Sequence, residues 1–215
     1  MPDELNLSLW FPGFEMGDMM PRTLSVLRQF PYSQVRPGIT AAAAYPLSWS
    51  EAPVYSHSFD FPVAPERAVT LVSEFLHEDY AYEFEALWDL WTPEGDEARL
   101  RCGGLCDSTT LPAVPGDAWV LRPVPVKIAA LGPRFEDADY RENGHILLRL
   151  GLDAPFLYDD QEFGDAEMRV RANVQKLVNF SSAVEKNCGT SGRVLWSESD
   201  ETLAQKLVAR LQRVQ

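Results

Sequence analysis

The stretch from residue 145 to residue 214 restricts the possible folds more than any other part of the chain. It begins with an apolar run typical of a buried strand, 145–151, and an amphipathic stretch follows at 165–186. A short apolar run, 193–196, precedes a second amphipathic stretch at 200–214. This order predicts a C-terminal β-α-β-α unit, in which two strands joined by a helix are most simply parallel neighbours with a right-handed crossover.

The first predicted helix of this unit carries a clear amphipathic pattern. Apolar or small residues recur along 165–186 at steps of four and three, which keeps them on one helical stripe. The acidic start and Lys186 near the end suit the helix dipole. Met168, Val178 and Phe180 lie beside the stripe, so we expect this helix to be covered on more than one side.

Most of the remaining chain has the pattern of strands. Period-two alternation, or a bracketed run of strand length, predicts strands at 5–11, 39–45, 55–61, 80–91 and 119–131, with 98–102 as a candidate hairpin partner of 80–91. Helices are predicted from Pro21 and from Pro65, because proline suits the first helical turn. Pro123 and Pro125 cannot donate to a strand ladder, so the first half of 119–131 is expected at a sheet edge or outside the sheet.

These elements together predict the fold class. Helices separate strands at both ends of the chain, while consecutive strands fill the middle, which favours an α+β fold with a mixed, largely antiparallel sheet and helices on one face. A length of 215 residues suits one domain over residues 1–215. If the chain is subdivided, the boundary is expected within 103–144, in the loop-like 103–118 or the acidic 132–144.

Composition and charge exclude some classes of function. The formal net charge of −13 disfavours binding to nucleic acid and to anionic membrane surfaces. No stretch approaches the roughly 20 apolar residues that span a bilayer, and residues 1–20 lack the pattern of a secretory signal. Three cysteines without such a signal favour a reducing compartment. We therefore expect an acidic, cytoplasmic protein that binds neither nucleic acid nor membrane.

The string Cys102-Gly-Gly-Leu-Cys106 most resembles a metal or redox site. Two thiolates in a glycine-rich loop can ligate zinc, with Cys188 or a histidine among the remaining ligands. A second closely spaced ligand pair is missing, and the C-x-x-C spacing of redox disulfides is absent. We therefore predict no cofactor, and zinc at Cys102 and Cys106 is the weaker alternative.

Two further groups of titratable residues lack a complete motif. The acids before and at the start of the long helix, Asp159, Asp160, Glu162, Asp165 and Glu167, fit oxygen ligation of a cation less well than a solvated loop that ends at a helix dipole. The three histidines are His57 on the apolar face of a half-buried strand, His77 at a helix end and His145 at a strand start. No nucleophile elbow, P-loop or dinucleotide fingerprint accompanies them, so no catalytic residue is assigned.

The predicted strand 80–91 offers a candidate interface. Leu87 and Trp91 share its otherwise acidic face with Glu83 and Glu85, and an apolar spot with an acidic rim is an arrangement that protein interfaces use. The alternative is that a helix covers this face.

Three functions remain open from the sequence. The first is a non-catalytic protein-interaction or regulatory domain that binds a protein partner or a second copy of itself. The second is a small enzyme with a dispersed site drawn from His57, His145, Cys102, Cys106 and the acids before the long helix. The third is a small-ligand-binding protein with an aromatic-lined pocket.

Overall fold

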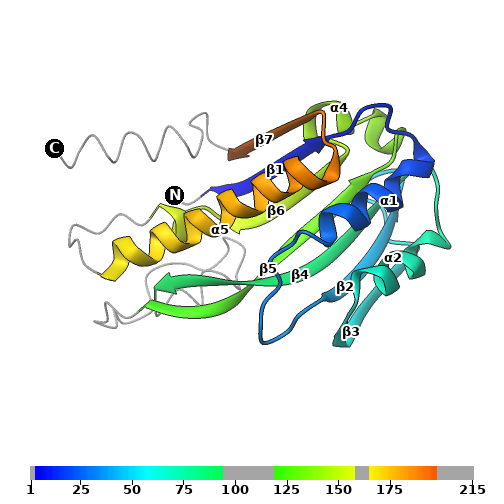
Figure 1. The fold of residues 1–215 in the computed structure, drawn as a ribbon. Coiled ribbons are helices and arrows are strands. Elements are labelled where there is room, and N and C mark those ends of the chain that lie inside the picture. Colours follow the sequence, from blue (N-terminus) through cyan, green and yellow to red (C-terminus); the bar gives the residue numbers. More distant parts are fainter. Residues whose placement is uncertain (1–2, 94–118, 158–164, 198–215) are drawn as a thin grey trace.

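In the part of the chain that the structure describes, the fold is a seven-stranded antiparallel sheet with helices packed on one face (Figure 1). The computed structural model describes residues 3–93, 119–157 and 165–197. The strands lie in the order β3-β2-β4-β5-β6-β1-β7, and every pairing between neighbours is antiparallel. Their bounds are β1 (Glu4–Trp10), β2 (Ile39–Pro46), β3 (Tyr55–Val63), β4 (Tyr80–Pro93), β5 (Trp119–Leu131), β6 (Ile146–Leu152) and β7 (Gly192–Ser197). The predicted α+β class is confirmed.

Three helices cover the same face of the sheet, α1 (Met16–Leu27), α2 (Pro65–Ser73) and α5 (Asp165–Cys188) (Figure 1). The connections β5–β6 and β6–α5 contain shorter turns of helix, η1 (Phe135–Asp137), α4 (Tyr140–Asn143) and η2 (Ala154–Phe156). The helix at 200–214 that completes the predicted C-terminal unit lies outside the described residues, as does the candidate strand 98–102.

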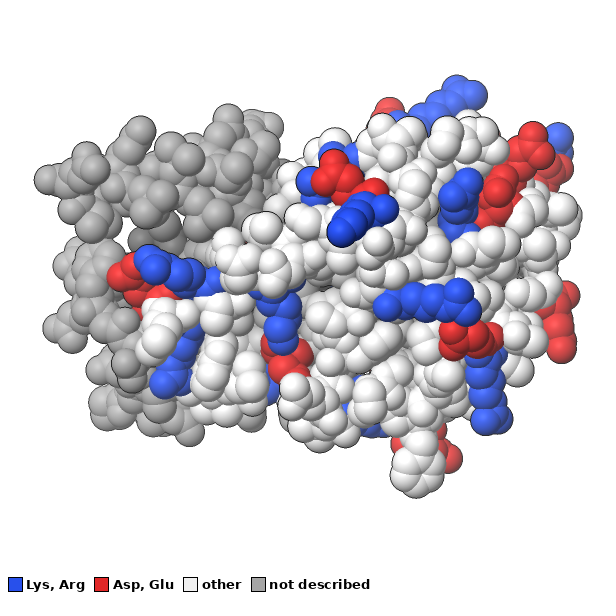
Figure 2. All heavy atoms as spheres, viewed as in Figure 1, with Lys and Arg blue, Asp and Glu red and all other residues white. Residues whose placement is uncertain are grey.

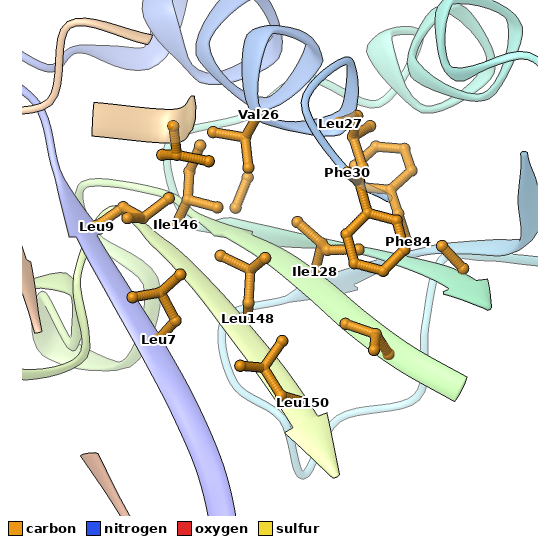
Figure 3. Close-up of a cluster of buried hydrophobic side chains, with 14 of the residues drawn as sticks. Leu7, Leu9, Val26, Leu27, Phe30, Phe84, Ile128, Ile146, Leu148 and Leu150 are labelled. Atoms are coloured by element: carbon orange, nitrogen blue, oxygen red, sulfur yellow. The ribbon is translucent and has the colours of Figure 1, made fainter. Parts of the chain in front are cut away.

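The core lies between the sheet and these helices. Alternate side chains of each central strand point toward the helices, because successive residues of a strand face opposite sides. Figure 3 shows aliphatic side chains of β1, β5 and β6 meeting the end of α1, where Val26 and Leu27 are fully buried. Trp88 of β4 is the largest fully buried side chain among the described residues, and it packs against Phe30 and Phe156, with ring centroids 6.0 and 5.9 Å away.

The β6-α5-β7 unit differs from its prediction in one respect. β6 and β7 run in the same direction but are not neighbours, because β1 lies between them and pairs antiparallel with both. The expectation of two parallel neighbouring strands is therefore wrong. β1 comes from the opposite end of the chain, and its fully buried Leu5, Leu7 and Leu9 complete this part of the core.

Two helix predictions also need correction. α1 begins at Met16, five residues before Pro21, because Glu15 and Asp18 form a reciprocal capping box. Pro21 therefore lies inside the helix and not in its first turn. α5 is covered along one stripe only, since Met168 is 64% exposed and Val178 is 50% exposed, while Phe180 is buried.

β4 and β5 extend beyond the rest of the sheet as a two-stranded arm, 87–93 paired with 119–125. β2 reaches only Ala86 of β4, and β6 reaches only Lys127 of β5. Pro123 and Pro125 lie in this arm, where β5 has no described strand on its other side. The prediction that the first half of 119–131 lies at an edge is confirmed, because the missing N–H groups of the prolines then interrupt no ladder.

Candidate functional site: the open face of the sheet

The face of the sheet opposite α1, α2 and α5, here called the open face, carries the sequence-predicted interface residues. Glu83, Glu85, Leu87 and Trp91 alternate along β4 with the buried side chains Phe84, Ala86, Trp88 and Leu90, which point toward the helices. The register places Lys127, Pro125 and Leu121 of β5 opposite Glu85, Leu87 and Trp91. The sequence pattern did not identify these β5 residues.

Apolar and small side chains make up much of this face near β4 and β5. Leu121 is 49% exposed, Pro123 and Pro125 are exposed, and Leu87 is half-buried. Trp91 is less available than the sequence suggested, because the Arg169 guanidinium of α5 lies 4.4 Å from the centre of its ring. Leu87, Leu121, Pro123 and Pro125 are therefore the apolar part of the open face, and Trp91 lies at its margin.

A buried carboxylate organises the charges of the open face. Glu83 lies between Lys127 Nζ, 3.0 Å from its Oε1, and Arg149 Nη1, 3.4 Å from its Oε2. Its side chain is 11% exposed, whereas that of Lys127 is 48% exposed. The Arg149 guanidinium also stacks 4.8 Å above the Trp49 ring. Because both Glu83 oxygens have cationic partners, this carboxylate holds β4, β5 and β6 together across the open face.

Glu85 lies next to this group and is only partly enclosed. Its Oε1 accepts a hydrogen bond from Thr40 Oγ1 at 2.8 Å. Lys127 is its register partner on β5, although the Lys127 ammonium contacts Glu83. Around this point two acidic side chains are balanced by Lys127 and Arg149, so this region is locally neutral on a chain of net charge −13.

A shallow hollow of about 80 Å³ lies beside these charges, above β2. Its lining is made mostly of small side chains with one aromatic and two acidic residues: Ala41, Ala42, Ala43, Tyr45, Ser56, Glu83 and Glu85. At the other end of β2, Trp49 folds over the open face and contacts Tyr45 and Phe135, with both ring-centroid distances 5.1 Å. One end of the open face is thus covered by the chain's own loop.

The helix-covered side also exposes apolar side chains, among them Met168 and Val178 of α5. Figure 2 shows this side, on which acidic and basic side chains lie close together at several places and neither sign forms a continuous patch among the coloured residues. Of the large apolar side chains whose exposure is described, Phe61 on the edge strand β3 is the most exposed, at 83%. There, Thr40 of β2 lies opposite a bulge of residues 59–62.

The described structure does not bring the histidines together. His57 is exposed on β3, although Tyr55 and Phe59 on the same face of this strand are half-buried against the core, and His77 is half-exposed beside Asp79. His145 precedes β6, and three strands separate β6 from β3, or about 19 Å at the usual strand spacing. The fold therefore does not bring His57 and His145 into one site.

His145 has a structural environment. Its ring stacks between Phe14 and Tyr140 at 4.2 and 4.9 Å, and its Nδ1 accepts the backbone N–H of Phe11 at 2.9 Å. Burial lowers the pKa of His145, because the charged form loses its hydration. A neutral imidazole with an unprotonated Nδ1 fits this hydrogen bond.

The remaining sequence candidates are mostly outside the described residues. This applies to Cys102, Cys106, Asp159, Asp160 and Glu162. Within residues 3–93, 119–157 and 165–197, no group of three or more His, Cys, Asp or Glu side chains is arranged to hold a metal ion. Glu167 contacts Arg171 one turn later in α5 at 2.8 Å, and the Cys188 thiol is buried against the core.

One polar residue of structural importance was missed by sequence reasoning. Asn173 of α5 is buried, and its side-chain amide accepts from the Trp91 N–H at 2.9 Å and donates to the Trp91 carbonyl at 2.8 Å. It also donates to the Pro155 carbonyl at 2.9 Å. The amide thus takes the place of a neighbouring strand at the arm's open edge. An asparagine between the apolar residues Val170, Val174 and Leu177 was the available signal.

The fold and this face together define an α+β protein in which, over residues 3–93, 119–157 and 165–197, one side of the antiparallel sheet is covered by α1, α2 and α5 and the other is the open face. No known family, no curated protein and no solved structure matches the chain. Among the described helices, none has the length and apolar character needed to cross a membrane.

Proposed function

We propose that this chain is a non-catalytic protein-interaction domain that docks through its open face, above β4 and β5. One observation carries the proposal: Leu87, Leu121, Pro123 and Pro125 form an apolar surface on the side of the sheet away from the helices. The uncovered face of an antiparallel sheet is normally polar. An apolar group with a charged rim is typical of interfaces.

The surrounding residues support this proposal. Glu85 and Lys127 provide a charged rim that can give a docking partner its register. The ion pairs of Glu83 hold the neighbouring strands in place, so the surface is formed before a partner arrives. A cytoplasmic, regulatory role is part of the same proposal.

The hollow on the open face does not itself support the ligand-binding alternative. Pockets for small ligands usually enclose about 300–1,000 Å³, and the hollow beside Glu83 and Glu85 has about 80 Å³. Such a hollow has room for a single side chain of a docked protein. We therefore include it in the docking surface.

The proposal is tested by site-specific photo-crosslinking in cells that express the protein. A photoreactive phenylalanine analogue replaces Leu121, and the control carries it at Val178 of α5, which has the same exposure within a percentage point. We expect a protein adduct from position 121 only, and Leu87→Glu should suppress it. Equal labelling from both positions, or no adduct from position 121, contradicts the docking surface.

A further inference from the structure

We infer that the docking partner is a second copy of this chain, packed open face against open face about a twofold axis that runs between β4 and β5, parallel to the strands. This inference rests on the proposed docking surface and names its occupant. Two sheets packed in this way lie about 10 Å apart, with their strands roughly aligned.

The register of β4 and β5 makes this face complementary to itself. A twofold axis between the two strands lays β4 of one copy over β5 of the other. Glu85 and Lys127 are direct register partners, so each Glu85 then faces Lys127 of the second copy. Leu87 and Pro125 are also register partners, and they meet in the same way. Isologous interfaces require such reciprocal contacts.

The charge distribution favours a second copy over a strongly basic partner. Two chains of net charge −13 repel each other over most of their surfaces. The region around Glu85 is locally neutral, because Lys127 and Arg149 balance Glu83 and Glu85. A basic partner would meet these two cations, whereas a second copy brings its own carboxylate to Lys127.

The shape of the face also permits close approach of two sheets. The side chains that project from the open face above β2 and β3 are short: Ala41, Ala43, Ser56 and Ser58. Prolines take this place on β5. The apolar contact then centres on Leu87, Leu121 and Pro125. Burial of apolar side chains of this size contributes about 1.5–3 kcal/mol each before the cost of association.

The first measurement is the mass of the full chain in solution, by light scattering over a wide range of concentrations. We expect a dimer for the wild type, Val178→Glu and Phe61→Glu, and a monomer for Leu121→Glu. The Leu121 change should weaken association about a hundredfold, since it buries a carboxylate near its own symmetry mate. The inference is overturned if the wild type stays monomeric. It is also overturned if Phe61→Glu, and not Leu121→Glu, dissociates the dimer.

Exchanging the charges of Glu85 and Lys127 distinguishes ion pairs between two copies from ion pairs within one copy. Lys127→Glu and Glu85→Lys should each weaken the dimer about tenfold or more, because like charges then face each other. An equal mixture of the two variants should restore it, because the acidic pair of one copy meets the basic pair of the other. A mixture no stronger than its components overturns the inference.

The two proposals fail in different ways. If the wild type is monomeric but position 121 still crosslinks to a different protein, the docking surface stands and the second copy is wrong. If circular dichroism shows that Leu121→Glu unfolds while Val178→Glu does not, Leu121 belongs to a core closed by its own chain. Both proposals then fail.

Discussion

The two faces of β4 give neighbouring residues opposite environments. Phe84, Ala86 and Trp88 are fully buried beneath the helices, while the residues between them carry charge or a half-buried apolar side chain. The helix side of this strand is stabilised by apolar packing. The open side is stabilised by the ion pairs of Glu83 and by a smaller apolar cluster around Ala81.

This difference teaches how an apolar side chain on each face should be interpreted. Leu148 of β6 is fully buried against the helices, and Leu121 of β5 is half-exposed on the open face. The first contributes to folding, and we propose that the second contributes to association. Matched substitutions on the two faces test whether the helix side contributes more to folding stability than the open side.

The largest effect is expected from a matched pair of leucine truncations. Leu148→Ala should lower the free energy of unfolding by about 2–5 kcal/mol, because it leaves a cavity among packed side chains. Leu121→Ala should cost less than about 1 kcal/mol in the monomer, since half of this side chain remains in water. Urea unfolding at low protein concentration measures both. Equal losses would show that the open face is as deeply packed as the helix side.

The next largest effect concerns the arm. Asn173→Ala removes the amide that bonds both backbone groups of Trp91 and the Pro155 carbonyl. Buried polar groups left unpaired cost about 1–3 kcal/mol, so we expect a loss of about 2–3 kcal/mol and faster amide exchange at Trp91. Gln175→Ala, on the exposed side of the same helix, is the control and should be nearly neutral. Unchanged exchange at Trp91 would show that another group holds the arm.

The open face has its own sensitive residue in Glu83. Glu83→Gln should cost about 1–3 kcal/mol, because Arg149 keeps its charge in a partly buried place without its carboxylate partner. Glu85→Gln should cost less than about 0.5 kcal/mol, since its hydrogen bond with Thr40 can persist. Denaturant unfolding of the two variants measures the difference. A smaller loss for the Glu83 change than for the Glu85 change would contradict the assigned roles.

Local patterns predicted the individual elements of this fold but not their arrangement. Period-two alternation identified 80–91 as a strand because each side chain's environment repeats along the chain itself. The position of β1 between β6 and β7 depends on contacts between opposite ends of the chain, which no local pattern records. The capping box of Glu15 and Asp18 was a local signal for the start of α1, and Pro21 obscured it.

The candidate site shows the same limit. Strand alternation correctly placed Glu83, Glu85 and Leu87 on one face, but it cannot tell which residues of another strand lie beside them. Lys127 and Leu121 joined the site only through the register of β4 with β5. Arg169, which stacks on Trp91, belongs to a helix far away in the sequence. The alternation along β4 therefore could not predict how exposed Trp91 is.

The smallest expected effect is a dependence of stability on pH that arises at His145. Burial lowers its pKa in the folded state, so the unfolded chain binds the proton more readily. Stability from this residue is then fully present above the unfolded pKa of about 6.5 and declines as pH falls below it, by at most about 1.4 kcal/mol per pH unit. Protonated Nδ1 also loses its bond to the Phe11 N–H.

Unfolding free energies at pH 7.5 and 5.5 test this assignment, with both values chosen to bracket a pKa of about 6.5. His145→Asn keeps an acceptor near the position of Nδ1 and cannot titrate, so its stability should fall less than that of the wild type. His57→Asn changes an exposed histidine on β3 and should keep the wild-type slope. If both variants keep that slope, His145 does not carry the pH dependence. Its stacking between Phe14 and Tyr140 is then a purely structural contact, indifferent to the charge of the ring.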